Sequence, residues 1–408
     1  MNAVAPSLQP VAAGQRITVM DSLRGFALLG ILLMNMEAFA GPLDLVLTGI
    51  DVHWQGVDRW ADALIYVLVQ GKFFTLFSLL FGAGFAVMAQ RAEAAGRAFT
   101  PFYLRRSAAL LLIGLCHALL IWSGDVLVTY ALASLMLLAF REAPRSWLPW
   151  LGAGSFLCGL AVMVLLGALI SVMAWHAPEE GAKMIASTLK DIEQERQAYA
   201  HGSWGEATRQ RVVELGRTLS ALFVAGPEVL GMFLIGSWFG RSGALAEPER
   251  FQRLYARLRW IALPLGLVLA VGGTAWMPYI EPGRYDLPAV VAMAINSLSG
   301  AVLCLGYLGW FMRLRTHLAW LAPAGRMALT NYLAQSVVCT LVFYGYGAGL
   351  FEQMPRAWQV VFALGLFGTQ LLASRAWLRR FRFGPMEWLW RAMTYLAWPP
   401  MRRDSLRG

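Results

Sequence analysis

The sequence predicts an all-α membrane protein, a polytopic bundle of about ten transmembrane helices. Of its 408 residues, 58% are apolar and only 14% are charged, whereas soluble domains carry about 25% charged residues. Apolar stretches long enough to cross a hydrocarbon core of about 30 Å recur along the whole chain. A chain with so few charges cannot cover a water-exposed surface, so the composition excludes an ordinary soluble domain.

The arginine residues predict the orientation of these helices. The expected spans cover residues 20–39, 61–89, 104–122, 124–140, 147–174, 219–240, 260–279, 288–312, 327–347 and 357–375. The loops after every second span are rich in arginine, whereas the opposite short loops hold only Arg59, Arg284 and Arg356. Because positive charge in short loops marks the cytoplasmic side, we expect both termini in the cytoplasm. The net charge of +10 then reflects topology, and we expect no nucleic-acid partner.

A long hydrophilic segment, residues 176–218, divides the chain. We expect it on the extracytoplasmic side, between a five-helix N-terminal membrane half (1–175) and a five-helix C-terminal half (219–408). Its charged, helix-forming composition fits either a solvated amphipathic connector or a cap over an outward-facing site. Residues 383–400 are aromatic and too short for an eleventh span, and they predict an interfacial helix. The tryptophans that would anchor it are Trp388, Trp390 and Trp398.

The first span carries polar residues that need partners in lipid. An arginine at mid-helix costs about 2.5–3.5 kcal/mol by insertion scales, which makes Arg24 a functional hypothesis by default. Asp21 lies three residues earlier, so the two side chains can form an ion pair on one helix face. Asn35 lies eleven residues after Arg24, on the same face but toward the outer side. This face is either an interhelical packing surface or part of a polar path across the membrane.

A second polar pair is expected at the turn between the third and fourth spans. His117 and Asp125 lie on either side of this turn, and antiparallel packing can bring them together. A carboxylate that orients an imidazole is a common arrangement for a general base. Asp125 is also well placed to cap the start of the fourth helix, and both interpretations remain open.

Two charged residues lie deep in other spans. Lys72 is the only lysine within an expected span. Because an unpaired charge is costly in lipid, we expect Lys72 to pair with a carboxylate such as Glu37, Asp125 or Glu228. Glu228 itself has no assigned partner.

The start of the ninth span is polar. Arg326, Thr330 and Asn331 follow Pro323 and Gly325, which interrupt the preceding helix. The exposed amides at the new helix start would suit an anion. The alternative is a capped helix anchored on the cytoplasmic side by its arginine.

Five sequence motifs together resemble the YeiB-like family of bacterial inner-membrane proteins, which carry the domain of unknown function 418. These motifs are residues 21–30, 72–82, 124–127, 325–332 and 383–390. They span nearly the whole chain. The resemblance implies a multi-pass protein of the bacterial inner membrane, and it implies an architecture more firmly than a reaction.

The first span is more distantly similar to that of the transmembrane acyltransferase superfamily. Arg24 and Asn35 match the spacing of an arginine and a catalytic histidine in the sugar O-acetylating members, so Asn35 is a departure from their pattern. The lysosomal glucosaminide N-acetyltransferases resemble this chain in having asparagine there. They carry a histidine in the following outward loop, a region where this chain has His53.

These features predict a membrane-embedded acyltransferase that moves an acyl group from cytoplasmic acyl-CoA to an extracytoplasmic or lipid-borne acceptor. His117 or His53 is the expected general base, Asp125 orients it, and Asn35 holds the acyl oxygen. The expected donor contacts are Arg24, Arg326, Asn331 and Lys72. We expect no metal. The expected partners are membrane lipids and a small-molecule, glycan or lipid acceptor.

A transporter or permease for a small metabolite or amphiphile is the alternative. It would use the same intramembrane charges and broken helices. A structural or lipid-sensing role would fit if all the polar groups were paired with one another.

Overall fold

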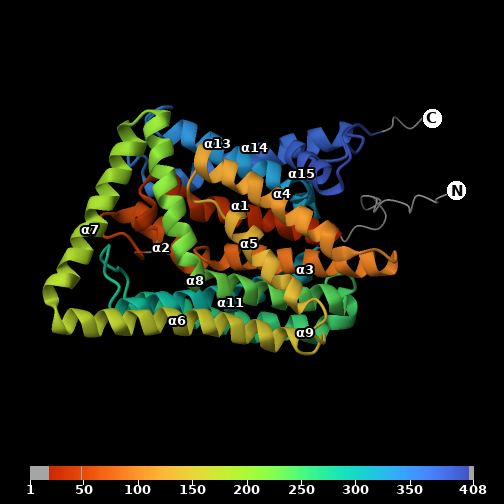
Figure 1. Ribbon diagram of the computed structural model, residues 1–408, viewed down its shortest axis with the longest axis horizontal. Helices are drawn as coiled ribbons and strands as arrows, with labels where there is room; N and C mark the ends of the chain where they lie inside the picture. The colour runs from red at the N-terminus through yellow and green to blue at the C-terminus, as the bar shows by residue number, and fades with distance from the viewer. Residues whose placement is uncertain (1–17, 47, 404–408) are drawn as a thin grey trace.

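The computed structural model describes residues 18–46 and 48–403. In this part of the chain the regular secondary structure is helical, apart from two isolated β-bridges, and turns and loops connect the helices. The helices, shown in Figure 1, are α1 Thr18–Ala40, α2 Gly56–Leu68, α3 Lys72–Ala94, α4 Phe99–Leu120, α5 Leu127–Leu137, α6 Leu148–His176, α7 Pro178–Arg196, α8 Trp204–Ser242, α9 Gln252–Arg257, α10 Leu263–Trp276, α11 Leu287–Leu314, α12 Ala322–Arg326, α13 Ala328–Phe343, α14 Arg356–Arg380 and α15 Pro385–Tyr395. The predicted all-α fold is confirmed.

Eight helical segments of the described chain are long and apolar enough to cross a membrane. Two apolar segments, Leu127–Phe140 and Ala328–Phe343, are shorter than the roughly 20 residues that a spanning helix needs. Together these ten segments correspond to the ten expected spans. The chain is therefore a multi-pass membrane protein.

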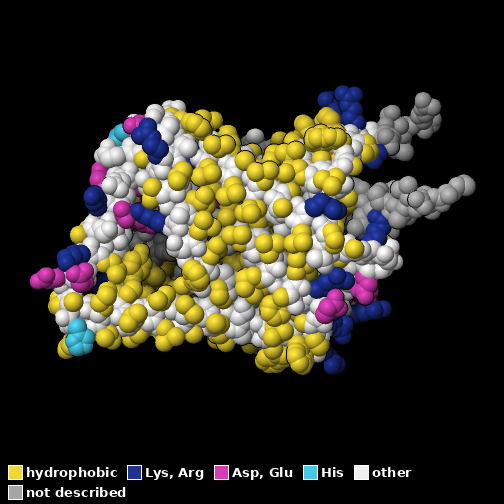
Figure 2. Space-filling model, in the orientation of Figure 1, with side chains coloured by type: hydrophobic (Ala, Val, Ile, Leu, Met, Phe, Trp, Pro, Cys, Tyr) yellow, Lys and Arg dark blue, Asp and Glu magenta, His cyan; other side chains and the backbone are white. Residues whose placement is uncertain are grey.

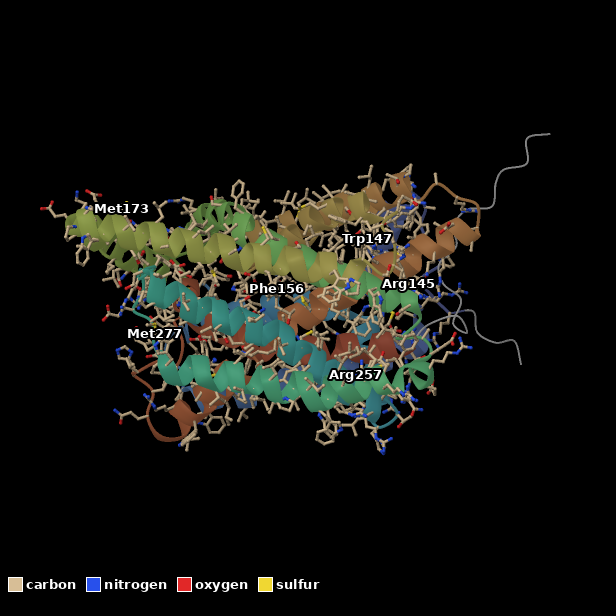
Figure 3. All side chains as sticks on the ribbon, turned by 90° about the horizontal axis from the view of Figure 1, so that it is seen from below. Arg145, Trp147, Phe156, Met173, Arg257 and Met277 are labelled. Carbon is tan, nitrogen blue, oxygen red and sulfur yellow. The ribbon has the colours of Figure 1, made fainter. Side chains whose placement is uncertain are left out.

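The two ends of the bundle differ in the residues they carry. Arg145 and Arg257 lie at one end, whereas Met173 and Met277 lie at the other (Figure 3). Helix α1 begins and α15 lies at the arginine end (Figure 1), which we call the basic end. Figure 2 shows hydrophobic side chains across the middle of the molecule and charged side chains gathered toward its ends. The sequence predicts that the basic end faces the cytoplasm.

The expected second span, residues 61–89, is two helices rather than one. Gly71 separates α2 from α3 and has φ 77°, a left-handed conformation that glycine adopts at little cost. Helix α3 alone has 23 residues, enough to cross the hydrocarbon core. The expected span therefore falls within the apolar segment 56–94, but the chain breaks at Gly71, which the sequence did not predict.

The hydrophilic segment 176–218 is almost entirely helical. It contains α7 and the first turns of α8, which begins at a capping box formed by Ser203 and Glu206. This Ser-x-x-Glu pattern is a recognised helix start that the sequence already displays. Helix α7 crosses the end of the bundle opposite the basic end (Figure 1). There, Arg196 Nε donates a hydrogen bond of 2.6 Å to Glu352 Oε2. The assignment of this segment to the extracytoplasmic side remains a prediction.

Close backbone contact between α3 and α8 joins the two halves of the chain. A Cβ atom on Gly236 would lie 1.9 Å from the Leu79 carbonyl oxygen, and one on Gly82 would lie 1.9 Å from that of Phe233. Ser237 Oγ donates a hydrogen bond of 3.1 Å to Gly82 O. Small residues at a helix interface are the usual means by which membrane helices approach closely.

Replacing Gly236 with alanine is expected to destabilise the bundle, because the added methyl group has no room against α3. Gly216 lies in the same helix with no atom within 4 Å of its added Cβ, so Gly216→Ala is the control. Thermal unfolding of the purified proteins in detergent should give a lower midpoint for Gly236→Ala only. Equal midpoints for the two variants would contradict the tight contact.

Candidate functional site

A cavity of about 300 Å³ lies between helices of both halves near the basic end. Helices α1, α3, α4 and α5 form one part of its wall, and α12, α13 and α15 form another. Six arginines contribute to the lining, namely Arg24, Arg91, Arg106, Arg326, Arg382 and Arg391. Asp21 and Glu387 are the carboxylates of this lining. Among the described residues of this lining, guanidinium groups outnumber carboxylates, a distribution that favours anions.

Several of these arginines are held by specific contacts. The predicted ion pair between Arg24 and Asp21 is present, with 3.1 Å between Nη1 and Oδ1. Arg106 lies over the indole of Trp390, with Cζ 3.6 Å from the ring centroid, a favourable cation–π arrangement. Trp390 Nε1 also donates to the Arg106 carbonyl oxygen at 2.9 Å. Helix α15, expected as an interfacial helix, is thus fastened to the start of α4.

The rest of the cavity is largely apolar. On α1, Arg24 is followed in the lining by Leu28 and Ile31, which occupy the same helix face one and two turns further on. Asn35 is the next residue on this face, four positions after Ile31 and buried. Val126 and Tyr332 also line the cavity. The cavity therefore joins a basic region to an apolar one that Tyr332 borders.

Directly beside this region, His117 and Asp125 form the predicted pair. The distance between His117 Nδ1 and Asp125 Oδ2 is 2.6 Å, and the two side chains are 1% and 2% exposed. The other carboxylate oxygen, Oδ1, accepts a hydrogen bond of 2.8 Å from the Val128 backbone N–H. Asp125 therefore bonds to the start of α5 and to the imidazole at the same time, so both expected contacts are present.

The second nitrogen of this imidazole is unpaired within the described part of the chain. His117 Nε2 is buried without a hydrogen bond to any residue that the structure describes. An ionised carboxylate can only accept a hydrogen bond, so an imidazole that donates from Nδ1 to Asp125 presents Nε2 on its other side. Tyr332 lies between this imidazole and the cavity, with the two ring centroids 5.2 Å apart.

Lys72 has a different partner from the one predicted. Its Nζ donates to Asn296 Oδ1 at 3.0 Å and to the Tyr66 carbonyl oxygen at 3.1 Å, and no described carboxylate pairs with it. The expectation of a carboxylate partner was wrong, because two neutral oxygens fill that position. Glu228 accepts a hydrogen bond of 2.5 Å from Ser297 Oγ. Lys72 does not line the cavity.

The anion expected at the start of the ninth span is part of the chain itself. Glu387 Oε1 accepts hydrogen bonds from Leu329 N at 2.7 Å and Thr330 N at 3.1 Å, and Oε2 accepts one from Thr330 Oγ1 at 2.6 Å. Burial raises the pKa of Glu387, and the bonds from Thr330 oppose this shift. Asn331 does not line the cavity. Its Nδ2 donates to Ala324 O and to Ser374 Oγ, a packing role.

The other predicted base, His53, lies elsewhere. Its side chain is 83% exposed, and its Nδ1 is 2.7 Å from Asp51 Oδ1. It does not line the cavity. Among the residues described, no group of three or more His, Cys, Asp or Glu side chains is arranged to hold a metal ion.

One buried ion cluster was missed by the sequence reasoning. Arg356 is 2% exposed, and its Nε donates to Asp62 Oδ1 at 2.9 Å while Nη2 lies 3.4 Å from Glu37 Oε2. Arg356 is one of the few arginines in the arginine-poor loops, and that exception was a signal that could have revealed the cluster.

The fold and the site define the class, a multi-pass α-helical membrane protein with an arginine-lined internal cavity. The family model "Protein of unknown function (DUF418)" matches residues 239–397. The chain is 35% identical to the uncharacterized protein YxaH of Bacillus subtilis (strain 168), over 98% of this chain and 99% of that protein. It is 33% identical to the uncharacterized protein YeiB of Escherichia coli (strain K12), over 95% and 98%. The chain therefore belongs to the YeiB-like DUF418 family, as its motifs predicted. No solved structure matches it.

Replacing Glu387 with alanine is expected to destabilise the protein, because the hydrogen-bond donors of Leu329 and Thr330 lose their acceptor. Leaving a buried donor unsatisfied costs about 1–3 kcal/mol. The side chain of Glu142 is 87% exposed, so Glu142→Ala is the control. Thermal unfolding in detergent should show a lower midpoint for Glu387→Ala than for Glu142→Ala. Unchanged unfolding of Glu387→Ala would mean that the carboxylate does not hold α15 against α13.

Proposed function

We propose that this protein is a membrane-embedded acyltransferase that takes an acyl group from cytoplasmic acyl-CoA and passes it to an extracytoplasmic or lipid-borne acceptor. One observation carries the proposal. An arginine-lined cavity leads into an apolar region that ends one side chain away from a buried His117–Asp125 pair.

The cavity suits a donor of this kind in two respects. Its arginines offer charge-assisted hydrogen bonds to phosphate groups, and the arginine distribution of the sequence predicts that they face the cytoplasm, where acyl-CoA is present. Its apolar part, lined by residues such as Leu28 and Ile31, would receive the uncharged arm that carries the thioester. Arg24 and Arg326 both line the cavity, as a role in donor binding requires.

In the proposed reaction, His117 Nε2 takes the proton from the hydroxyl or amine of the acceptor. The acceptor oxygen or nitrogen attacks the thioester carbonyl carbon, and the carbon–sulfur bond breaks. The thiolate leaves with the proton that His117 took, as free CoA. Asp125 holds the Nδ1 side of the ring and stabilises the imidazolium that forms between the two proton transfers. Asn35, one turn beyond the cavity-lining Ile31 on α1, would donate to the acyl oxygen as it gains charge.

A transporter remains the alternative because of one observation. The cavity is walled by helices from both halves of the chain, which is also where transporters place a substrate site. The two functions differ in their product. A transferase releases one CoA for each acyl group transferred, whereas a transporter binds its substrate and leaves it unchanged.

The proposal includes a location and partners. The bacterial relatives and the membrane-spanning helices support the bacterial inner membrane as the site of action. The acceptor would be a small molecule, a glycan or a lipid that reaches His117 from the end opposite the arginines.

Replacing Arg24 with glutamine is expected to weaken the binding of labelled acetyl-CoA to the purified protein. Losing one charge-assisted hydrogen bond, worth about 1.5–3 kcal/mol, should raise Kd roughly 10- to 100-fold. Arg284→Gln is a matched control, because Arg284 also pairs with a nearby aspartate, Asp286, at 3.0 Å but does not line the cavity. If saturating acetyl-CoA does not bind to the wild type, the proposed donor is excluded.

Replacing His117 with alanine is expected to lower kcat for CoA release roughly 100-fold or more, with the Kd for the donor unchanged, because the base acts only on the acceptor proton. Asp125→Asn should also lower kcat. The exposed His176 provides the control variant His176→Ala, whose rate should equal that of the wild type. Loss of activity in His53→Ala, with full activity in His117→Ala, would transfer the role of base to His53.

A further inference from the structure

Buried side chains separate the cavity from His117, and the role inferred for this boundary rests on the proposed function. His117 is 1% exposed and does not line the cavity, whereas Tyr332 and Val126 do. The imidazole packs beside Trp122 and Tyr332, with centroid distances of 6.3 Å and 5.2 Å. A donor in the cavity therefore meets Tyr332 before it meets His117.

Few polar contacts hold the tyrosine in this position. Its hydroxyl accepts one hydrogen bond of 3.3 Å, from the Val126 backbone N–H, and donates none to any residue that the structure describes. This bond is longer than the usual range for a backbone donor. The ring is 5% exposed and borders the cavity, so it has open space on one side and the imidazole on the other.

The neighbouring groups are held much more firmly. Asp125 fixes His117 Nδ1 at 2.6 Å and also caps α5, so the imidazole and the start of α5 form one rigid unit. Glu387 holds the start of α13 through three hydrogen bonds. Both backbones that flank Tyr332 are thus held in place, so an opening of this boundary would have to come from the Tyr332 side chain.

We propose that Tyr332 is the gate between the donor cavity and His117. While the hydroxyl of Tyr332 accepts the hydrogen bond from the Val126 N–H, its ring separates the cavity from His117 Nε2. When the ring moves away from Val126, the cavity becomes continuous with the space around His117 Nε2. A thioester in the cavity then lies beside the base. Keeping the base closed until then protects the thioester from hydrolysis, because water excluded from Nε2 cannot be activated by it. Tyr332 is in this sense a positioning residue.

The test measures the accessibility of His117 and does not depend on activity. Purified protein in detergent is treated with diethyl pyrocarbonate, and mass spectrometry follows the modification of each histidine. The exposed His53, His176, His201 and His317 serve as internal standards. In the wild type, His117 should react far more slowly than these four. In Tyr332→Ala, its rate should rise about 10-fold or more, with the standards unchanged.

Two control variants separate a gate from general loosening. Tyr332→Phe keeps the ring but loses the hydrogen bond to Val126, so His117 should react at a rate between those of the wild type and Tyr332→Ala. Tyr255 is equally buried, with its hydroxyl bonded to Ala244 O at 2.8 Å, and it does not line the cavity. Tyr255→Ala should therefore leave His117 protected. An unchanged rate in Tyr332→Ala, or an equal rise in Tyr255→Ala, overturns the proposal.

A second measurement keeps this inference distinct from the proposed function. If acetyl-CoA is a donor, Tyr332→Ala should hydrolyse it faster than the wild type in the absence of an acceptor. If no acetyl-CoA is bound or cleaved but His117 becomes accessible in Tyr332→Ala, the boundary is as proposed and the acyltransferase function is wrong. If acyl transfer is found and His117 stays protected in Tyr332→Ala, the gate is wrong and the function stands.

Discussion

Polar groups inside an apolar bundle must find their partners within the protein, and the rest of this structure depends on that constraint. Hydrocarbon offers no hydrogen bonds, so an unpaired buried group costs several kcal/mol. Arg356 and Lys72 meet the constraint with carboxylate, amide and carbonyl oxygens. Polar groups that are hydrogen-bonded in this way are accounted for by their structural role. His117 Nε2 is one of several buried polar atoms without a hydrogen bond among the described residues, and its ring also contacts Tyr332, which lines the cavity.

The sequence predicted best those contacts that short-range geometry determines. Asp21 and Arg24 are three residues apart on one helix, and helical periodicity alone brings them together. His117 and Asp125 flank a single turn, so the hairpin limits how far apart they can be. The two roles considered for Asp125 were not true alternatives, because each oxygen of one carboxylate serves one of them. The class of fold was equally accessible, since the length and frequency of apolar stretches leave few other solutions.

Contacts between distant segments could not be predicted in the same way. Lys72 meets Asn296 of α11, and Glu387 of α15 reaches the start of α13. In both cases the sequence showed a group that needed a partner, but helix packing decided which of several suitable residues supplied it. The break at Gly71 was missed for a related reason. Composition alone does not show where a long apolar stretch changes direction, whereas the left-handed conformation of one glycine does.

The arrangement of charge along α1 limits what the cavity can bind. Arg24 and Asn35 are eleven residues apart, which is about 16 Å along a helix at 1.5 Å per residue. The lining between them consists of Leu28 and Ile31. A small anion held by Arg24 would have to leave water to pass the apolar side chains that follow on α1. A wholly apolar ligand would gain nothing from the guanidinium groups. A ligand that used both regions, as the proposed function requires, would need an anionic head joined to a long uncharged arm.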